Sequence, residues 1–132
     1  MLVRLPPQSG VTGRVEVTQG VLEFATAGAW ANVTNFAASG SGTLKVSASE
    51  VFPRKADASV GVGAKLEIAS GCVQTCGWLY LPDGGGVMHK QRMGVYSSAA
   101  GDGVNFVDAV HFSGGGKLVV RGDGGGTMLI FR

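Results

Sequence analysis

The stretch Gly20-Val21-Leu22-Glu23-Phe24 decides the fold, because its pattern returns along the chain at a step of 22 residues. Two apolar positions recur at that step: Leu22 and Phe24, Leu44 and Val46, Leu66 and Ile68. A charged residue separates each apolar pair: Glu23, Lys45 and Glu67. Because side chains alternate between the two faces of a β-strand, this pattern predicts a short strand with apolar residues inward and its charge outward.

One such coil cannot bury its own apolar face and must stack on its neighbours, so the repeat predicts a solenoid. We expect an all-β, single-stranded, right-handed parallel β-helix with about 22 residues per coil and at most six coils in 132 residues. The same step places Trp30, Phe52 and Gln74 in one column. The ladder therefore extends beyond a single strand.

We expect one domain over residues 1–132, with a long insertion at about residues 82–116 where the period is lost. The expected strands cover residues 13–17, 20–24, 33–36, 43–46, 77–81, 116–120 and 126–130. Leu79 and Leu118 should extend the inward rows, and the last strand should expose Leu129 and Phe131. The start of the chain lacks the apolar core of a signal peptide and reads like a cut in a linker, so we expect a module of a longer protein.

The amino-acid composition excludes several structural classes and kinds of partner. Glycine accounts for 23 residues without a three-residue period, which excludes collagen. The net charge of +2 is small and the basic residues are scattered, so we expect no nucleic-acid partner. No apolar run approaches the roughly 18 residues of a membrane span. Cys72 and Cys76 suit either a small disulfide loop or two independent buried thiols.

Metal ligands are sparse. Two histidines and three aspartates stand in the insertion: His89, His111, Asp83, Asp102 and Asp108. No pair has a spacing such as His-x-His, so we expect no metal and no cofactor. Calcium is left open at the Gly-Asp-Gly turns around Asp102 and Asp123, with an ordinary Asx turn as the alternative.

Catalytic signatures are missing as well. Glu16, Glu23 and Glu67 stand on outward strand faces, where a solvated charge is the default. The chain has no Gly-x-Ser-x-Gly elbow, and its glycine runs lack the Gly-Lys-Ser/Thr tail of a phosphate loop. We predict a protein that is not an enzyme.

Binding remains as the expected activity. If Leu79 and Leu81 point inward, Trp78 and Tyr80 point outward on one face, and paired aromatic rings suit a sugar surface. We expect the ligand to contact these rings and polar side chains of the insertion: Trp78, Tyr80, Tyr96, Asp83, Gln91, Arg92, Asp108 and His111. The alternative is that the insertion covers the rings and that Tyr96, Phe106 and Phe112 only dock it.

Several motifs carry a family resemblance: Gly42 to Val46, Leu79-Tyr80-Leu81, Gly94-Val95-Tyr96, and Val110 to Gly114 before Leu118-Val119-Val120. They resemble the β-solenoid repeats of large secreted bacterial proteins, including autotransporter-like passengers. The chain is also similar in size and pattern to the β-helical, xylan-binding modules of carbohydrate-binding module family 89, attached to enzymes of gut bacteria. That resemblance implies a right-handed parallel β-helix with affinity for xylan or xylo-oligosaccharides.

The expected function is a non-catalytic, secreted carbohydrate-binding module that holds a covalently attached glycoside hydrolase on plant cell-wall polysaccharide. Its partners would be a polysaccharide or oligosaccharide and the catalytic domain, with a cell-surface location left open and no membrane contact. The alternative is a structural solenoid segment of a secreted adhesin or autotransporter-like protein. A small lyase acting on a uronic acid polymer is the third possibility.

Overall fold

The computed structural model describes residues 2–4 and 13–122, and these form strands without a helix. The strands are β1 (Leu2–Arg4), β2 (Gly13–Phe24), β3 (Val33–Val46), β4 (Asp57–Val60), β5 (Lys65–Ile68), β6 (Val73–Cys76), β7 (Leu79–Pro82), β8 (Met88–Lys90), β9 (Gly94–Ser97), β10 (Phe106–Val107), β11 (Phe112–Ser113) and β12 (Lys117–Val120). They build a β-solenoid with a spacing of about 22 residues, which confirms the predicted architecture. The predicted strand at residues 126–130, with Leu129 and Phe131, lies outside the described residues, as does Asp123.

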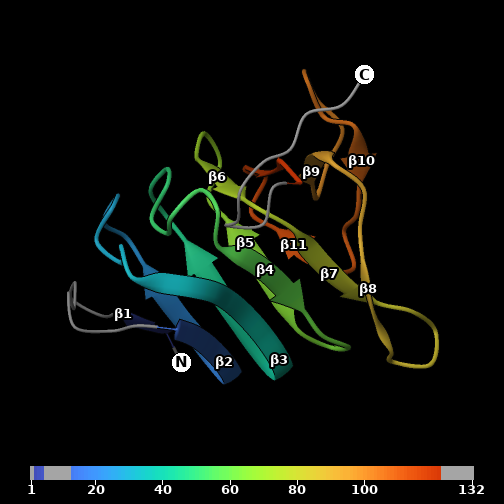
Figure 1. Cartoon of the computed structure of the whole chain (residues 1–132), viewed down its shortest axis with the longest axis horizontal. Helices are drawn as coiled ribbons and strands as arrows, with labels where there is room; N and C mark the ends of the chain where they lie inside the picture. The colour runs from blue at the N-terminus through green and yellow to red at the C-terminus, as the bar shows by residue number, and fades with distance from the viewer. Residues whose placement is uncertain (1, 5–12, 123–132) are drawn as a thin grey trace.

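The strands stack in three parallel columns. The first half of β2, the first half of β3, β4 and β7 form the first column, and they lie side by side in Figure 1. The second column contains β1, the second halves of β2 and β3, β5 and β11. The third contains β6 and β12. In the second column, Leu22 pairs with Leu44, Leu44 with Leu66, and Leu66 with Phe112, so the predicted leucine row is real.

β2 and β3 pass from the first column to the second without a break. The expected strands at residues 13–17 and 20–24 are therefore one strand, and so are those at 33–36 and 43–46. A register shift between Val17 and Gln19 lets the pair turn the corner while it stays hydrogen-bonded. Gly42 is required at this corner, because a Cβ there would collide with the carbonyl oxygen of Val17.

Apolar side chains fill the space between the columns. Leu44 and Leu79 are 0% exposed, and Leu66 and Leu118 are also buried. Phe36 stacks on Phe52 with ring centroids 4.6 Å apart. Burying a side chain of this size contributes roughly 1.5–3 kcal/mol, so these inward rows supply much of the stability.

A buried polar ladder fixes the third column. Gln74 is 0% exposed, its Nε2 donates to the Phe52 carbonyl oxygen at 3.0 Å, and its Oε1 accepts from the Phe52 backbone N–H at 3.1 Å. Glu50 accepts from the Thr75 backbone N–H at 2.7 Å and from the Thr75 hydroxyl at 2.6 Å. The predicted pairing of Phe52 with Gln74 is confirmed, and the two coils are joined there by side chains.

The insertion occupies the place of a short turn. In the third coil, residues 61–64 lead from β4 in the first column to β5 in the second. In the fourth, the chain leaves β7 at Pro82 and re-enters the second column only at Phe112. Residues 83–111 thus form the insertion, slightly shorter than the expected 82–116, and carry β8, β9 and β10 at one end of the stack (Figure 1).

Cys72 and Cys76 do not form a disulfide. Of the alternative, two independent buried thiols, only Cys76 is buried, and Cys72 is partly exposed. Within residues 2–4 and 13–122 there is no helix that is long and apolar enough to cross a membrane.

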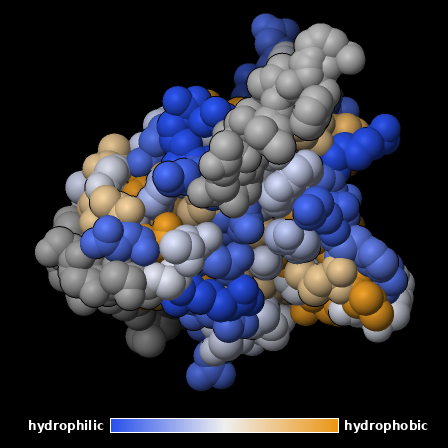
Figure 2. Space-filling view, in the orientation of Figure 1, coloured by the Kyte–Doolittle hydropathy of each residue, from blue (hydrophilic) through white to orange (hydrophobic). Residues whose placement is uncertain are grey.

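One corner of the solenoid exposes apolar side chains. Val62 and Val87 are more than half exposed, and Met88 is also exposed. The tip of the β7–β8 hairpin lies near Val62, because a Cβ on Gly86 would come within 3.8 Å of its Cγ2. Figure 2 shows apolar colour at the lower right, where Figure 1 draws this hairpin.

Candidate functional site

Trp78 and Tyr80 lie on the outward side of β7, as predicted. Leu79 and Leu81 are buried. Tyr80 is half-buried, and so is Trp78, which immediately precedes β7 and also packs against the core. The insertion contacts this surface because β8 pairs antiparallel with β7, with Tyr80 opposite Lys90. The Nζ of Lys90 lies 4.4 Å from the centroid of the Trp78 ring, a cation–π contact. The rings are therefore neither fully open to solvent nor fully covered.

A hollow of about 430 Å³ adjoins the Trp78 ring. Its walls are Trp78, Lys90, Gln91, Arg92 and Met93. Three of the eight predicted binding residues line it, and sequence reasoning missed Lys90 and Met93. The side chain of Gln91 donates to the carbonyl oxygen of His89 at 3.0 Å, so its amide is partly engaged within the insertion.

Tyr96 is a docking residue. It is 4% exposed, and its ring stacks on Phe106 with centroids 4.6 Å apart and tilts against Phe112 at 6.0 Å. The Tyr96 hydroxyl donates to the Arg92 carbonyl oxygen at 2.8 Å. Burial raises the pKa of Tyr96. The Tyr96 ring is thus not exposed for sugar binding, because it is buried and packs β9 against Phe106 and Phe112.

Asp83 closes the hairpin that precedes β8. Its Oδ1 accepts from the backbone N–H groups of Gly85 at 2.8 Å and Val87 at 3.0 Å, and its Oδ2 lies 2.8 Å from His89 Nε2. The hydrogen bond with His89, with those from Gly85 and Val87, lowers the pKa of Asp83. The carboxylate thus makes its hydrogen bonds within its own hairpin.

Asp108 and His111 form a second pair of this kind, just before β11. Asp108 Oδ1 accepts from the backbone N–H groups of Val110 at 2.9 Å and His111 at 3.0 Å, and its Oδ2 lies 2.8 Å from His111 Nδ1. Partial burial raises the pKa of Asp108, but the hydrogen bonds from the His111 ring and the two backbone N–H groups outweigh it, so this pKa lies below its ordinary value. Both side chains hold the loop and do not line the Trp78 hollow.

This pair makes stability depend on pH. Since the pKa of Asp108 is lowered by folding, its stabilising contribution is present above the ordinary aspartate pKa of about 3.9 and is lost as the pH falls through the lower folded value. We expect Asp108→Asn to lower the free energy of unfolding at pH 7, and the difference from wild type to shrink below about pH 4. Urea unfolding from pH 7 to pH 2 measures it.

The control for that series is Asp102→Asn. Within the described part of the chain the Asp102 carboxylate makes no hydrogen bond or ion pair, and the residue is exposed. Its substitution should change little at any pH. Equal profiles for the two variants would contradict the role given to Asp108.

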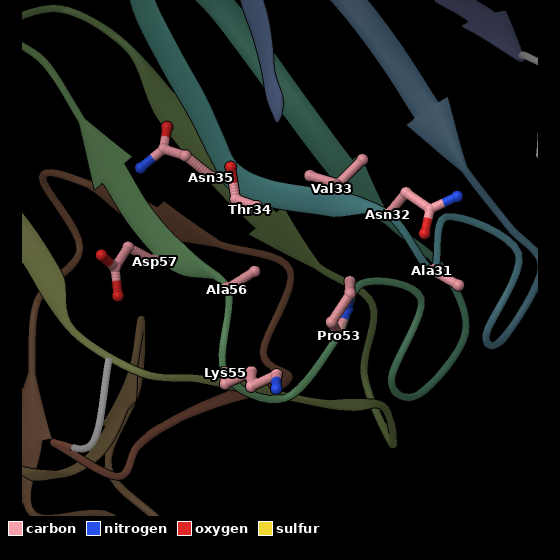
Figure 3. A pocket seen from close by; sticks show the side chains of 9 residues that line it. All are labelled: Ala31, Asn32, Val33, Thr34, Asn35, Pro53, Lys55, Ala56 and Asp57. Atoms are coloured by element: carbon pink, nitrogen blue, oxygen red, sulfur yellow. The ribbon is translucent and has the colours of Figure 1, made fainter. Parts of the chain in front are cut away.

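A second hollow, of about 600 Å³, lies beside the start of β3 and was missed by sequence reasoning. Figure 3 shows Asn35 and Asp57 on neighbouring strands, with Lys55 on the loop that leads into β4. Asn35 Oδ1 accepts from Arg14 Nη1 at 2.6 Å, and Asp57 Oδ1 accepts from the Trp78 backbone N–H at 2.9 Å. The 22-residue step relates Asn35 to Asp57 and could have found this polar row. Both side chains link consecutive coils.

The described residues hold no group of three or more His, Cys, Asp or Glu side chains that could bind a metal ion. At the first Gly-Asp-Gly turn, the Lys117 ammonium donates to the Asp102 carbonyl oxygen at 2.6 Å. A cation already contacts that oxygen, which does not favour calcium there.

The comparisons with known proteins gave no match to a family model, to a curated protein or to a solved structure. The fold class, an all-β parallel solenoid, is therefore what the structure itself establishes.

Proposed function

We propose that this chain is the terminal segment of a structural β-solenoid, in which residues 83–111 close one end of the stack. The observation that carries this proposal is strand direction. Strands of successive coils pair in parallel throughout the described solenoid. At the last coil, however, β8 pairs antiparallel with β7, and β9 pairs antiparallel with β12.

An antiparallel strand on these edges ends the stack in the first and third columns. The outer edge of a final coil exposes backbone N–H and C=O groups that would otherwise pair with another chain, and solenoids need a cap there. Here the Gln91 backbone N–H donates to the Leu79 carbonyl oxygen at 2.8 Å, and Tyr96 stands opposite Leu118. A further coil cannot occupy edges that β8 and β9 already use.

The side chains of the insertion support the same proposal. Tyr96 and Phe112 are buried, and Asp83 and Asp108 each close a loop with a histidine. Four of the eight residues that the sequence offered as ligand contacts, Tyr96, Asp83, Asp108 and His111, thus hold the insertion in place. In this role the protein performs no catalytic step, and its parent would be a secreted adhesin or an autotransporter-like surface protein.

The test is to replace the cap by an ordinary turn. Substituting Gly-Val-Gly-Ala, the sequence of residues 61–64, for residues 83–111 leaves the solenoid columns but uncovers β7 and β12. We expect this variant to associate in a concentration-dependent way, and the complete chain not to associate through these two edges, as measured by sedimentation velocity. A variant that is folded by circular dichroism and does not associate would contradict the proposal.

Hydrogen exchange on the complete chain keeps the proposal testable if that variant does not fold. Amides that β8 and β9 cover in β7 and β12 should exchange as slowly as those of β3, between two coils. Fast exchange at Leu79, Leu81 and Leu118 would show that the edges are open.

A second candidate function is the binding of plant cell-wall polysaccharide, xylan above all, to anchor an attached glycoside hydrolase. The hollow beside Trp78 supports it, because a half-buried indole next to Gln91 and Arg92 combines a ring face with hydrogen-bond donors. The test is affinity electrophoresis against xylan, β-glucan, mannan and pectin. Retention on xylan that Trp78→Ala abolishes and Val110→Ala preserves would support it; folded protein without retention on any glycan would overturn it.

A further inference from the structure

The end of the solenoid opposite the insertion is less closed than its middle. Phe36 is 1% exposed and Leu44 is 0% exposed, whereas their partners on the first coil, Val15 and Leu22, are only half-buried. These positions belong to the same inward rows, so the difference does not come from the sequence pattern. The core is therefore incomplete at Val15 and Leu22, whereas Val17 and Phe24 of the same coil are buried.

At this end the second column extends one strand beyond the first, so the backbone forms a step between the two columns. β1 pairs in parallel with the second half of β2, placing Val3 opposite Leu22. Within residues 2–4 and 13–122, no strand pairs with the outer edge of the first half of β2. A hollow of about 560 Å³ runs along the inner corner of this step and is lined by residues 16–22. The second column thus has one more strand than the first.

The spacing of the coils identifies what fits the step. The path from the first column to the second takes seven or eight residues, from Val15 to Leu22 and from Phe36 to Leu44. A strand beside Val15 that continues into β1 must therefore lie seven or eight residues before Val3. A strand that continues into β1 at this spacing would therefore lie before Met1.

We propose that the outer edge of β2 at residues 13–17 binds a parallel strand of a preceding solenoid coil, supplied by a segment N-terminal to β1 in a longer chain. This inference rests on the proposed structural function and gives it a direction: the solenoid extends from the β2 end and stops at the insertion. The incoming strand needs apolar or small side chains beside Val15 and Val17, to complete the core that the first coil leaves half-open.

The experiment extends the complete chain by one strand. A copy of residues 33–41, placed directly before Met1, puts its phenylalanine eight residues before Val3, the spacing that separates Phe36 from Leu44. The matched control has the same length, with aspartate in place of the phenylalanine and of the second alanine, the two inward positions. Both chains are compared with the original by hydrogen exchange of residues 13–17.

We expect the apolar extension to slow exchange at residues 13–17 roughly tenfold or more, and the aspartate control to leave it unchanged. Equal exchange in the two extended chains would overturn the inference, and so would a dimer of the original chain with residues 13–17 already protected, which would make a second copy the occupant. The amides of β7 and β12 separate the two proposals. If the β7 and β12 amides are protected but residues 13–17 exchange fast in every chain, the proposed cap is supported and this inference fails. If the β7 and β12 amides exchange fast in every chain, the proposed function fails.

Discussion

Leu44→Asp is expected to leave the chain unfolded at room temperature, while Lys45→Ala should barely change its melting temperature. Leu44 is 0% exposed and pairs with Leu22 on one side and Leu66 on the other, so its side chain lies in the middle of the inward row. Truncating a buried leucine costs about 2–5 kcal/mol, and an unpaired buried carboxylate adds to that loss. Domains are stable by only about 5–15 kcal/mol, so this single change removes most or all of the margin.

The neighbouring residue is the matched control. The Lys45 side chain is on the opposite face, 27% exposed, with its Nζ 3.8 Å from Glu67. Surface ion pairs contribute about 0–1 kcal/mol, so Lys45→Ala should stay close to wild type. Thermal unfolding followed by circular dichroism compares the two variants. Similar losses from both would show that the inward and outward faces are assigned wrongly.

Much of the fold could be predicted because one row of residues repeats without interruption. Leu22, Leu44 and Leu66 stand 22 residues apart, and each pairs with the next in register. The period of two also assigned the faces correctly around Leu44 and Leu66. It was wrong at Glu23, which was expected outward and solvated but is 3% exposed. Three copies of the strand are enough to show the repeat. Each copy has the two-residue alternation within the strand, and each stands 22 residues from the next.

The fourth coil was hidden because the insertion breaks the step. Another 22 residues beyond Leu66 lead to Met88, which is exposed on β8, whereas the true partner of Leu66 is Phe112. Leu79 and Leu118 were correctly predicted to point inward, but they belong to the first and third columns. Periodicity carries no information on how long a turn is, so only the structure places the re-entry point.

The sequence predicted the side-chain orientation of the site residues at β7, but not the contacts of those in the loops of the insertion. Alternation around Leu79 correctly placed Trp78 and Tyr80 outward. The pairing of Asp108 with His111 depends on how the insertion closes, which short-range patterns do not encode. Residues that look available for a ligand in the sequence are thus committed to hydrogen bonds within their own loops.

Gln74→Ala is expected to destabilise the chain by about 2–5 kcal/mol, the second-largest single effect. Gln74 follows Trp30 and Phe52 at the 22-residue step and pairs with Leu118 on the next coil. Its amide donates to and accepts from the backbone of Phe52 at 3.0 and 3.1 Å. A third hydrogen bond runs from Nε2 to the Thr75 carbonyl oxygen at 2.8 Å. Removing the amide leaves these buried groups without partners and opens a cavity. Gln19→Ala, on an exposed position of β2, is the control and should cost little.

Gln74→Glu distinguishes hydrogen bonding from packing, because it keeps the shape of the side chain. Its second carboxylate oxygen would face the carbonyl oxygens of Phe52 and Thr75 and lie near Glu50, whose Oε1 is 3.5 Å from the present Nε2. Burial and these acceptors would raise the folded pKa of the introduced carboxyl, so stability should be lost as the pH rises through it and partly regained on acidification. Urea unfolding at pH 7 and pH 5 measures this. If Gln74→Glu matches wild type at both values, the ladder is not what joins these coils; if it loses stability at pH 7 and recovers at pH 5, the hydrogen bonds of Gln74 hold the third column in register.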